Sequence, residues 1–164
     1  MAWPAAFALL HESAAVPSAA RLGLESYIRC EVSVQIVTYN RPKLLLEALQ
    51  QIEHQDYPGR ISVSIIDDSP VSCQMAVEAF ARRSRHRIQY RCLPERRSIG
   101  AKRNLAVHQE TDAEVICTWD DDDIYSCDRV RLQVQALQSC KCATMERRYF
   151  YWSSTGALRS CGLF

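Results

Sequence analysis

The chain has 164 residues, of which 48% are hydrophobic and 24% charged, as in a single globular domain. Its 20 Lys+Arg and 19 Asp+Glu give a net charge of +1, so the overall charge offers no basis for binding nucleic acid or an anionic membrane. No apolar run approaches the roughly 18 residues that span a bilayer, and we predict a cytoplasmic protein without an integral membrane segment.

The chain divides into three parts. Residues 1–29 carry Ala, Ser and Pro without a sustained period and predict an unstructured tail or leader. Residues 30–140 predict the main domain, and residues 141–164 an irregular C-terminal segment in which 148–152 could form a strand. The patterns in the main domain predict strands at 32–39, 61–66, 87–92 and 113–119, alternating with helices at 42–52, 72–84, 101–108 and 128–138. This alternation predicts a three-layer α/β/α fold with a mostly parallel sheet.

The start of the first helix has its own signals. Asn40 is a residue type that caps helices, and Pro42 suits a first turn. We therefore expect Asn40 to be the N-cap residue.

The eight cysteines do not form a recognisable metal or disulfide pattern. No CxxC pair occurs, and the closest pair, Cys140 and Cys142, has a spacing that is poor for zinc. We predict that the thiols are free.

Polar clusters follow three of the predicted strands. They are Thr38 to Arg41, Asp67 to Ser69, and the four aspartates Asp120 to Asp123. In an open parallel sheet, ligands bind beyond the carboxyl ends of the strands, and we expect these clusters to converge there.

The chemistry of these clusters suits a nucleotide and a metal ion. Carboxylate oxygens are the ligands of hard cations such as Mg²⁺ and Mn²⁺, and an Asp-x-Asp at a strand end can hold one such ion with its bound phosphates. The basic loop from Arg96 to Arg103 opens a helix whose first amides also favour anions. Each cluster has an alternative interpretation. The four aspartates could be solvated, or could stabilise the N-terminus of the next helix by their charge. Asp67 and Asp68 could belong to a turn and helix cap. The arginines could form a solvated face.

Taken together, residues 31–138 resemble the nucleotide-binding half of family 2 glycosyltransferases of the GT-A fold. The pieces that carry the resemblance occur in the family's order and are Val32 to Pro42, His54-Gln55-Asp56-Tyr57-Pro58, Ile65 to Ser69, Ile99 to Asn104, Trp119 to Asp123 and Asp128-Arg129-Val130. The resemblance implies a Rossmann-like fold and an inverting, metal-dependent transfer of sugar from a nucleotide-diphosphate sugar, most simply a UDP-sugar, to an unknown acceptor.

The resemblance also implies roles for individual residues. Thr38 and Asn40 would line the nucleotide pocket, Asp67 and Asp68 would contact the base or ribose, and Lys102 and Arg103 would lie near the base or phosphates. Asp120 and Asp122 would form the Asp-x-Asp, with Asp122 as ligand of Mn²⁺ or Mg²⁺. A register shifted by one, with Asp121 and Asp123, stays open because the run is degenerate.

Two features of the family have no counterpart here. Its general base follows well after the Asp-x-Asp, whereas Glu146 is the last carboxylate and its surroundings differ from that base; no Gln-x-x-Arg-Trp motif occurs. The sequence therefore predicts a truncated family member, with a catalytically incomplete nucleotide-sugar-binding module as the alternative. An aspartate phosphatase is disfavoured, because Asp122 is followed by Asp123 and Ile124 rather than by a small residue and Thr or Val.

Overall fold

The computed structural model describes residues 30–109, 112–144, 147–152 and 157–162. The predicted tail, residues 1–29, lies outside this part. The chain forms two compact units, residues 1–131 and residues 132–164.

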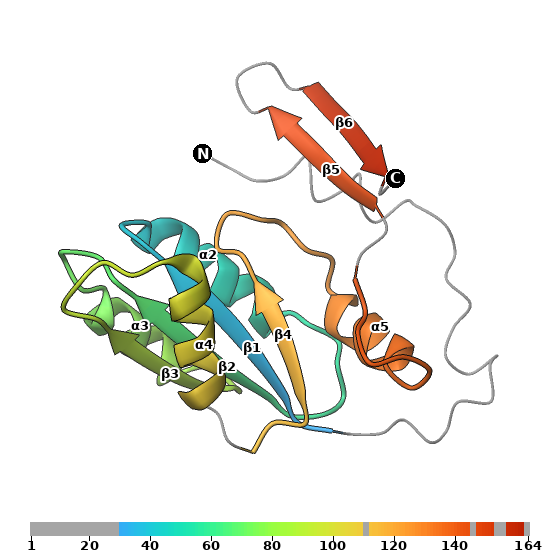
Figure 1. The fold of residues 1–164 in the computed structure, drawn as a ribbon, viewed down its shortest axis with the longest axis horizontal. Coiled ribbons are helices and arrows are strands. Elements are labelled where there is room, and N and C mark those ends of the chain that lie inside the picture. Colours follow the sequence, from blue (N-terminus) through green and yellow to red (C-terminus); the bar gives the residue numbers. More distant parts are fainter. Residues whose placement is uncertain (1–29, 110–111, 145–146, 153–156, 163–164) are drawn as a thin grey trace. The chain divides into compact units, whose positions relative to one another are not determined.

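A four-stranded parallel sheet is the centre of the first unit (Figure 1). Its strands are β1 (Val32–Thr38), β2 (Ile61–Asp67), β3 (Arg87–Cys92) and β4 (Val115–Trp119), in the order β3-β2-β1-β4. Every neighbouring pair is parallel. The helices between them are α2 (Pro42–Glu53), α3 (Gln74–Ala81) and α4 (Ile99–Gln109), and α5 (Arg129–Ala136) follows β4. Figure 1 shows α4 on one face of the sheet and α2 and α3 on the other, which confirms the predicted α/β class with its parallel sheet.

The sheet has one apolar face, and it packs against α2 and α3. Alternate residues of the two central strands point to this face, and all are buried: Val32, Val34, Ile36, Ile61, Val63 and Ile65. Helix α2 adds Leu45, Ala48, Leu49 and Ile52, and α3 adds Val77 and Phe80. These side chains recur at helical spacing, so each helix presents one apolar stripe to the sheet. The main core of the first unit therefore lies on this side.

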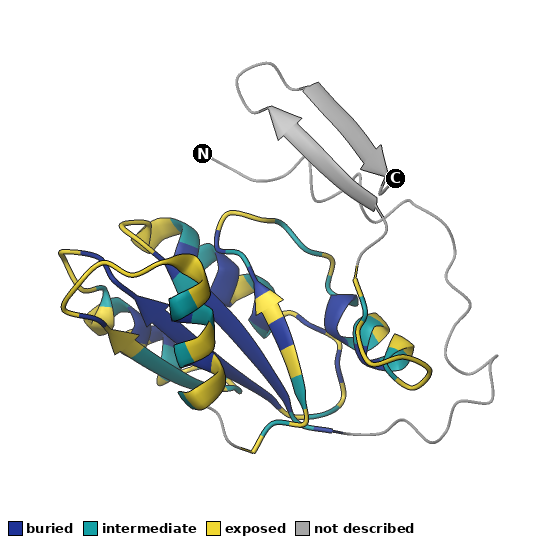
Figure 2. Ribbon diagram, viewed as in Figure 1, coloured by how far each residue is buried: buried dark blue, intermediate teal, exposed yellow. Residues whose placement is uncertain are grey.

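The face toward α4 is more polar. Its buried polar residues on β1 and β2 are Ser33, Gln35, Ser62 and Ser64, and the Ser64 hydroxyl lies 3.4 Å from the backbone oxygen of Ala106 in α4. Apolar contact with α4 is concentrated near the strand ends, in a cluster of Ile66, Leu93 and Ala106 with Val37 and Leu105 packed against it. Both central strands are buried along almost their whole length (Figure 2), although nearly half of their buried side chains are polar.

The start of α2 differs from the prediction. The N-cap residue is Arg41 and not Asn40, and Pro42 begins the helix as expected. Asn40 instead has φ of 52°, in the left-handed region, and its backbone N–H donates to the Ser69 hydroxyl at 2.6 Å. Asparagine adopts the left-handed conformation more readily than most residues. Asn40 therefore occupies a left-handed backbone position before the helix and does not cap it.

The second unit contains an antiparallel pair of strands, β5 (Arg147–Trp152) and β6 (Ala157–Gly162). The first of these agrees with the strand predicted at 148–152. The second was not predicted, because its sequence, ALRSCG, has neither regular alternation nor β-branched residues.

No helix in the described part of the chain is long and apolar enough to cross a membrane.

Candidate functional site

Polar residues gather at the carboxyl ends of the strands, and we call them the strand-end cluster. Its members share a hydrogen-bonded or ionic contact with another member at this edge of the sheet. They are Thr38, Asn40, Arg41, Asp67, Asp68, Ser69, Arg96, Arg97, Lys102, Arg103, Asp120, Asp121 and Asp122. The predicted convergence of β1, β2 and β4 is thus present, since their parallel register brings these ends together.

A buried ion pair lies at the centre of the strand-end cluster. The Lys102 ammonium is 2.7 Å from the Asp68 carboxylate and 2.8 Å from the backbone oxygen of Thr38. The side chains of Asp68 and Lys102 are 0% and 4% exposed. Burial raises the pKa of Asp68, but the backbone N–H of Arg97 and the charges of Lys102 and Arg96 outweigh it and hold that pKa below its ordinary value. The pair ties α4 to the ends of both central strands.

Asp67 is surrounded by donors of its own segment and of β3. One of its oxygens accepts from the backbone N–H of Ser69 at 2.8 Å and also from the Ser69 hydroxyl. Its other oxygen accepts from the Tyr90 hydroxyl at 2.6 Å and the Cys73 thiol at 3.2 Å. Burial and this carboxylate both raise the pKa of Tyr90. Asp67 therefore orders the turn after β2.

Of the four aspartates, Asp121 alone is buried. The Asp121 side chain is 4% exposed and accepts from the Thr38 hydroxyl at 2.6 Å. Asp120 and Asp122 are half-exposed. Arg103 lies 3.0 Å from Asp120, and Arg41 lies 2.7 Å from Asp122 and 3.2 Å from Asp121. Asp123 receives a hydrogen bond from the Tyr125 hydroxyl at 2.8 Å.

The donor set fits a hard divalent cation. Two half-exposed carboxylates, Asp120 and Asp122, already attract cationic groups, the guanidinium ions of Arg103 and Arg41. Within the described residues, no three His, Cys, Asp or Glu side chains are gathered as a complete metal site. In proteins Mg²⁺ is commonly held by one or two carboxylates together with phosphates of the substrate, and here Asp120 and Asp122 would be those carboxylates.

Helix α2 holds the segment after the aspartates along its length. Arg41, at its start, contacts Asp121 and Asp122. One turn before its end, the Gln51 amide donates to the backbone oxygen of Asp123 at 3.2 Å and accepts from the backbone N–H of Tyr125 at 2.8 Å.

Just past the end of α2, buried Gln55 continues this attachment. Its amide donates to the backbone oxygen of Ser126 at 2.8 Å and accepts from the backbone N–H of Val130 at 3.0 Å. Asp56 adds an ion pair with Arg131 at 3.0 Å. These contacts fix the path of residues 121–131.

Trp119 and Tyr125, which flank the aspartates in the sequence, pack together with Arg129. Trp119, the last residue of β4, is buried with its ring 4.5 Å from that of Tyr125. The Arg129 guanidinium lies 3.6 Å from the Tyr125 ring and 4.5 Å from the Trp119 ring, and donates to the backbone oxygen of Thr118 at 2.7 Å. The group links the end of β4 to the start of α5.

The basic loop before α4 contacts the first strand through Arg96. Its guanidinium lies 3.2 Å from the centre of the Tyr39 ring and 3.7 Å from Asp68. Arg97 contributes its backbone N–H, 2.8 Å from Asp68.

Sequence reasoning placed Arg41 in a polar cluster at the end of the first strand and Gln55 in a segment that resembles the family, but it gave neither a role and did not name Gln51. Gln55 could have been noticed, because a glutamine beside an apolar helix and before Tyr57-Pro58 is a candidate for a buried amide. Within the described part of the chain, no disulfide joins the cysteines Cys30, Cys73, Cys92, Cys117, Cys127, Cys140 and Cys142.

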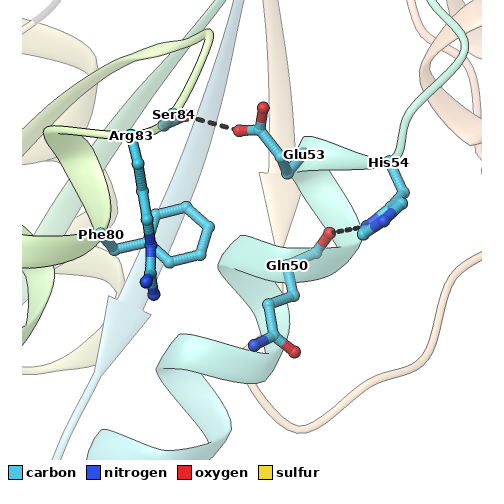
Figure 3. A pocket seen from close by; sticks show the side chains of 6 residues that line it. All are labelled: Gln50, Glu53, His54, Phe80, Arg83 and Ser84. Atoms are coloured by element: carbon cyan, nitrogen blue, oxygen red, sulfur yellow. Dashed lines mark hydrogen bonds between the residues drawn. The ribbon is translucent and has the colours of Figure 1, made fainter.

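A pocket of about 320 Å³ lies elsewhere on the first unit (Figure 3). It is formed by Gln50, Glu53 and His54 of α2 and its end, and by Phe80, Arg83 and Ser84 from the end of α3. Helices α2 and α3 run back from the carboxyl ends of the strands, so their own ends reach the opposite edge of the sheet. The pocket shares no residue with the strand-end cluster.

Solved structures with the same fold are known. That of S. aureus TarS residues 1–349 in complex with UDP is 24% identical, with a TM-score of 0.58 over 66% of this chain and 32% of that one. Another structure of S. aureus TarS is 24% identical, with a TM-score of 0.57 over 66% of this chain and 19% of that one. At this identity the likeness establishes the fold alone.

A second kind of neighbour is more similar. The mannosyltransferase PcManGT from Pyrobaculum calidifontis, in complex with GDP-Man and Mn²⁺, is 28% identical, with a TM-score of 0.63 over 70% of this chain and 34% of that one. The chain thus spans about a fifth to a third of the length of these structures. No curated protein sequence gives a significant match.

The sequence profile described as glycosyl transferase family 2 matches residues 33–160, which is more than half of the chain and includes the whole strand-end cluster. The chain belongs to glycosyl transferase family 2.

Proposed function

We propose that the strand-end cluster binds a nucleotide-diphosphate sugar, most simply a UDP-sugar, together with Mn²⁺ or Mg²⁺, for transfer of the sugar to an acceptor. The observation that carries this proposal is the pair of half-exposed carboxylates, Asp120 and Asp122, each beside a guanidinium at the carboxyl edge of a parallel sheet. Neighbouring structures with this fold hold UDP, UDP-GlcNAc, or GDP-Man with Mn²⁺.

The exposure of the aspartates supports one register for the metal. Asp121 is buried against Thr38, whereas Asp120 and Asp122 keep half of their surface open. We therefore assign the metal to Asp120 and Asp122, and Asp121 to holding Thr38 and Arg41. A divalent ion there would neutralise the diphosphate as it leaves the sugar.

The remaining residues would bind and orient the donor. Thr38, Asn40 and Asp68 would form the wall near the nucleoside, with Asp68 held in place by Lys102. Arg103, half-exposed at the start of α4, would approach the phosphates when the metal takes over Asp120. Asp67 would act indirectly, by ordering the turn on which Asp68 sits.

The test is a calorimetric titration with uridine diphosphate in the presence and absence of Mn²⁺. We expect Asp122→Ala to weaken Mn²⁺-dependent binding at least roughly tenfold, or about 1.4 kcal/mol. Asp123→Ala is the matched control, since it removes the adjacent carboxylate, and should change affinity by less than about threefold. Equal affinity with and without Mn²⁺ would contradict the metal site, and a loss confined to Asp123→Ala would move the register by one. Guanosine diphosphate and UDP-sugars in the same titration identify the donor.

A further inference from the structure

Arg41 has an unusual position in the strand-end cluster, because a single side chain serves two carboxylates. Its Nη1 lies 2.7 Å from Asp122 and 3.2 Å from Asp121. Its backbone is fixed as the N-cap of α2, where its oxygen accepts from the N–H of Leu45 at 3.0 Å. The side chain itself is 48% exposed. The backbone of Arg41 is therefore fixed, whereas its half-exposed side chain has room to change conformation.

We propose that Arg41 is an exchangeable counter-cation: it neutralises Asp122 when no donor is bound, and the incoming metal–diphosphate displaces it from Asp122 onto the phosphates. This inference rests on the proposed function of the same site. It assigns to this chain a residue that couples binding of the metal to binding of the diphosphate.

The two contacts of Arg41 differ in a way that suits such an exchange. Asp121 is buried and keeps the Thr38 hydroxyl at 2.6 Å, so it stays hydrogen-bonded when the guanidinium moves. Asp122 is half-exposed, and its ionic contact is with Arg41. A guanidinium is cationic in proteins whether or not it is paired, so Arg41 can exchange one anion for another. Asp121 therefore keeps a hydrogen-bond partner after the guanidinium moves, and the contact with Asp122 is the one that the metal ion replaces.

The exchange makes binding of metal and of diphosphate cooperative. A metal ion alone competes with Arg41 for the Asp122 oxygens and leaves the guanidinium without its anion. A metal ion that arrives with a diphosphate supplies phosphate oxygens for the guanidinium, beside the N-terminus of α2, which also favours anions. Loss of Arg41 should therefore strengthen binding of the metal alone and weaken its cooperation with the diphosphate, and this coupling is reciprocal between the two ligands.

The experiment measures Mn²⁺ affinity from the electron paramagnetic resonance signal of the free ion, with and without saturating uridine diphosphate. We expect Arg41→Gln to bind Mn²⁺ alone roughly five times more tightly than the wild type, and to lose most of the gain that uridine diphosphate brings. Arg41→Lys keeps the charge but contacts one carboxylate at a time, and should lie between the two. Lys43→Gln is the charge control, because Lys43 is 84% exposed with Glu47 as partner at 4.0 Å; its values should match the wild type.

The outcomes separate this inference from the proposed function. If the wild type shows no binding of uridine diphosphate with Mn²⁺, the donor site itself is wrong. If it does, and both Arg41 variants keep the wild-type affinity for Mn²⁺ alone and the wild-type gain, the exchange is wrong and the donor site stands. If Lys43→Gln strengthened Mn²⁺ binding as much as Arg41→Gln, the effect would come from the change in net charge, and the exchange would be overturned. Circular dichroism of each variant checks that it is folded.

Discussion

Asp68 and Lys102 show at the scale of single residues how this site is built. Two charges lie inside the protein, 2.7 Å apart, and one of them also bonds the backbone of Thr38. Such a pair contributes little over an apolar substitute, but removal of one partner leaves a buried charge, which costs about 3–5 kcal/mol. The pair therefore makes the position of α4 depend on the end of β2.

The first prediction concerns this pair. Lys102→Met should lower the free energy of unfolding by about 3 kcal/mol, since the Asp68 carboxylate keeps the Arg97 N–H but loses its buried cation. Lys43→Met removes an exposed lysine with a long contact to Glu47 and should change it by less than about 0.5 kcal/mol. Urea denaturation measures both. Similar small losses in the two variants would contradict the burial of the pair.

The pair also sets a dependence on pH. Because the pKa of Asp68 lies below its ordinary value, the carboxylate stabilises the fold at any pH above the pKa of the unfolded chain, about 3.9. This stability is lost as the pH falls through the lower pKa of the folded protein. In Lys102→Met the favourable cation is absent, so acid unfolding should begin at higher pH than in the wild type. A series of denaturation curves from pH 7 to pH 3 would show the shift.

At the scale of elements, α2 has two surfaces with different tasks. Its apolar stripe packs on the sheet through Leu45, Ala48, Leu49 and Ile52. Its flank, with Gln51 and then Gln55, binds the backbone that follows the aspartates. A helix that looks from its pattern like a simple cover of the sheet thus also positions the candidate metal ligands.

The second prediction follows from Gln55. Gln55→Leu leaves the backbone N–H of Val130 and the oxygen of Ser126 without their buried partner, which should cost about 2 kcal/mol of stability. It should also weaken Mn²⁺-dependent nucleotide binding, because the segment that carries Asp122 loses an anchor. Gln51→Leu is the control and should cost less, because its bond to Asp123 is exposed and its bond to Tyr125 is only partly buried, whereas the bond of Gln55 to Val130 is buried. Thermal denaturation and the calorimetric titration give the two values; a greater loss in Gln51→Leu would contradict this account.

The elements and their polar ends could be predicted from the sequence, whereas the pairings between them could not. Alternating apolar residues identified β1 and β2, and the order of elements implied a parallel sheet whose ends converge. That Lys102 meets Asp68, and Arg103 meets Asp120, depends on α4 crossing from β3 to the far side of β1. No local pattern carries this order. The left-handed conformation of Asn40 and the strand β6 were not predicted. Asparagine is also a common helix cap, and the sequence of β6 lacks β-branched residues.

For the folded unit as a whole, apolar contact is unequal on the two sides of the sheet. Helix α2 buries four apolar side chains, whereas the buried residues of α4 are Lys102 and Ala106. The strands below α4 present Ser33, Gln35, Ser62 and Ser64. Since burial of apolar surface is the main stabilising contribution, α4 should open more easily than α2.

The third prediction is a difference in amide hydrogen exchange. In the free protein, amides in the middle of α4 should exchange at least about tenfold faster than those of α2, equivalent to about 1.4 kcal/mol. Uridine diphosphate with Mn²⁺ should slow α4 selectively, because the proposed donor site joins Lys102 and Arg103 to the aspartates. The Asp122→Ala variant under the same conditions is the control. Exchange at equal rates in both helices would contradict this difference in stability.

The contacts at the two ends of α2 also constrain the length of this helix. Arg41 at one end and Gln55 beyond the other are bonded to fixed points between Asp121 and Val130. One inserted residue would rotate Gln55 by about 100° around the helix axis and carry it off this backbone, although the apolar stripe could slide to compensate. The spacing between Arg41 and Gln55 is therefore tied to the spacing between the aspartates and α5, and an insertion or deletion in one of these segments calls for a matching change in the other.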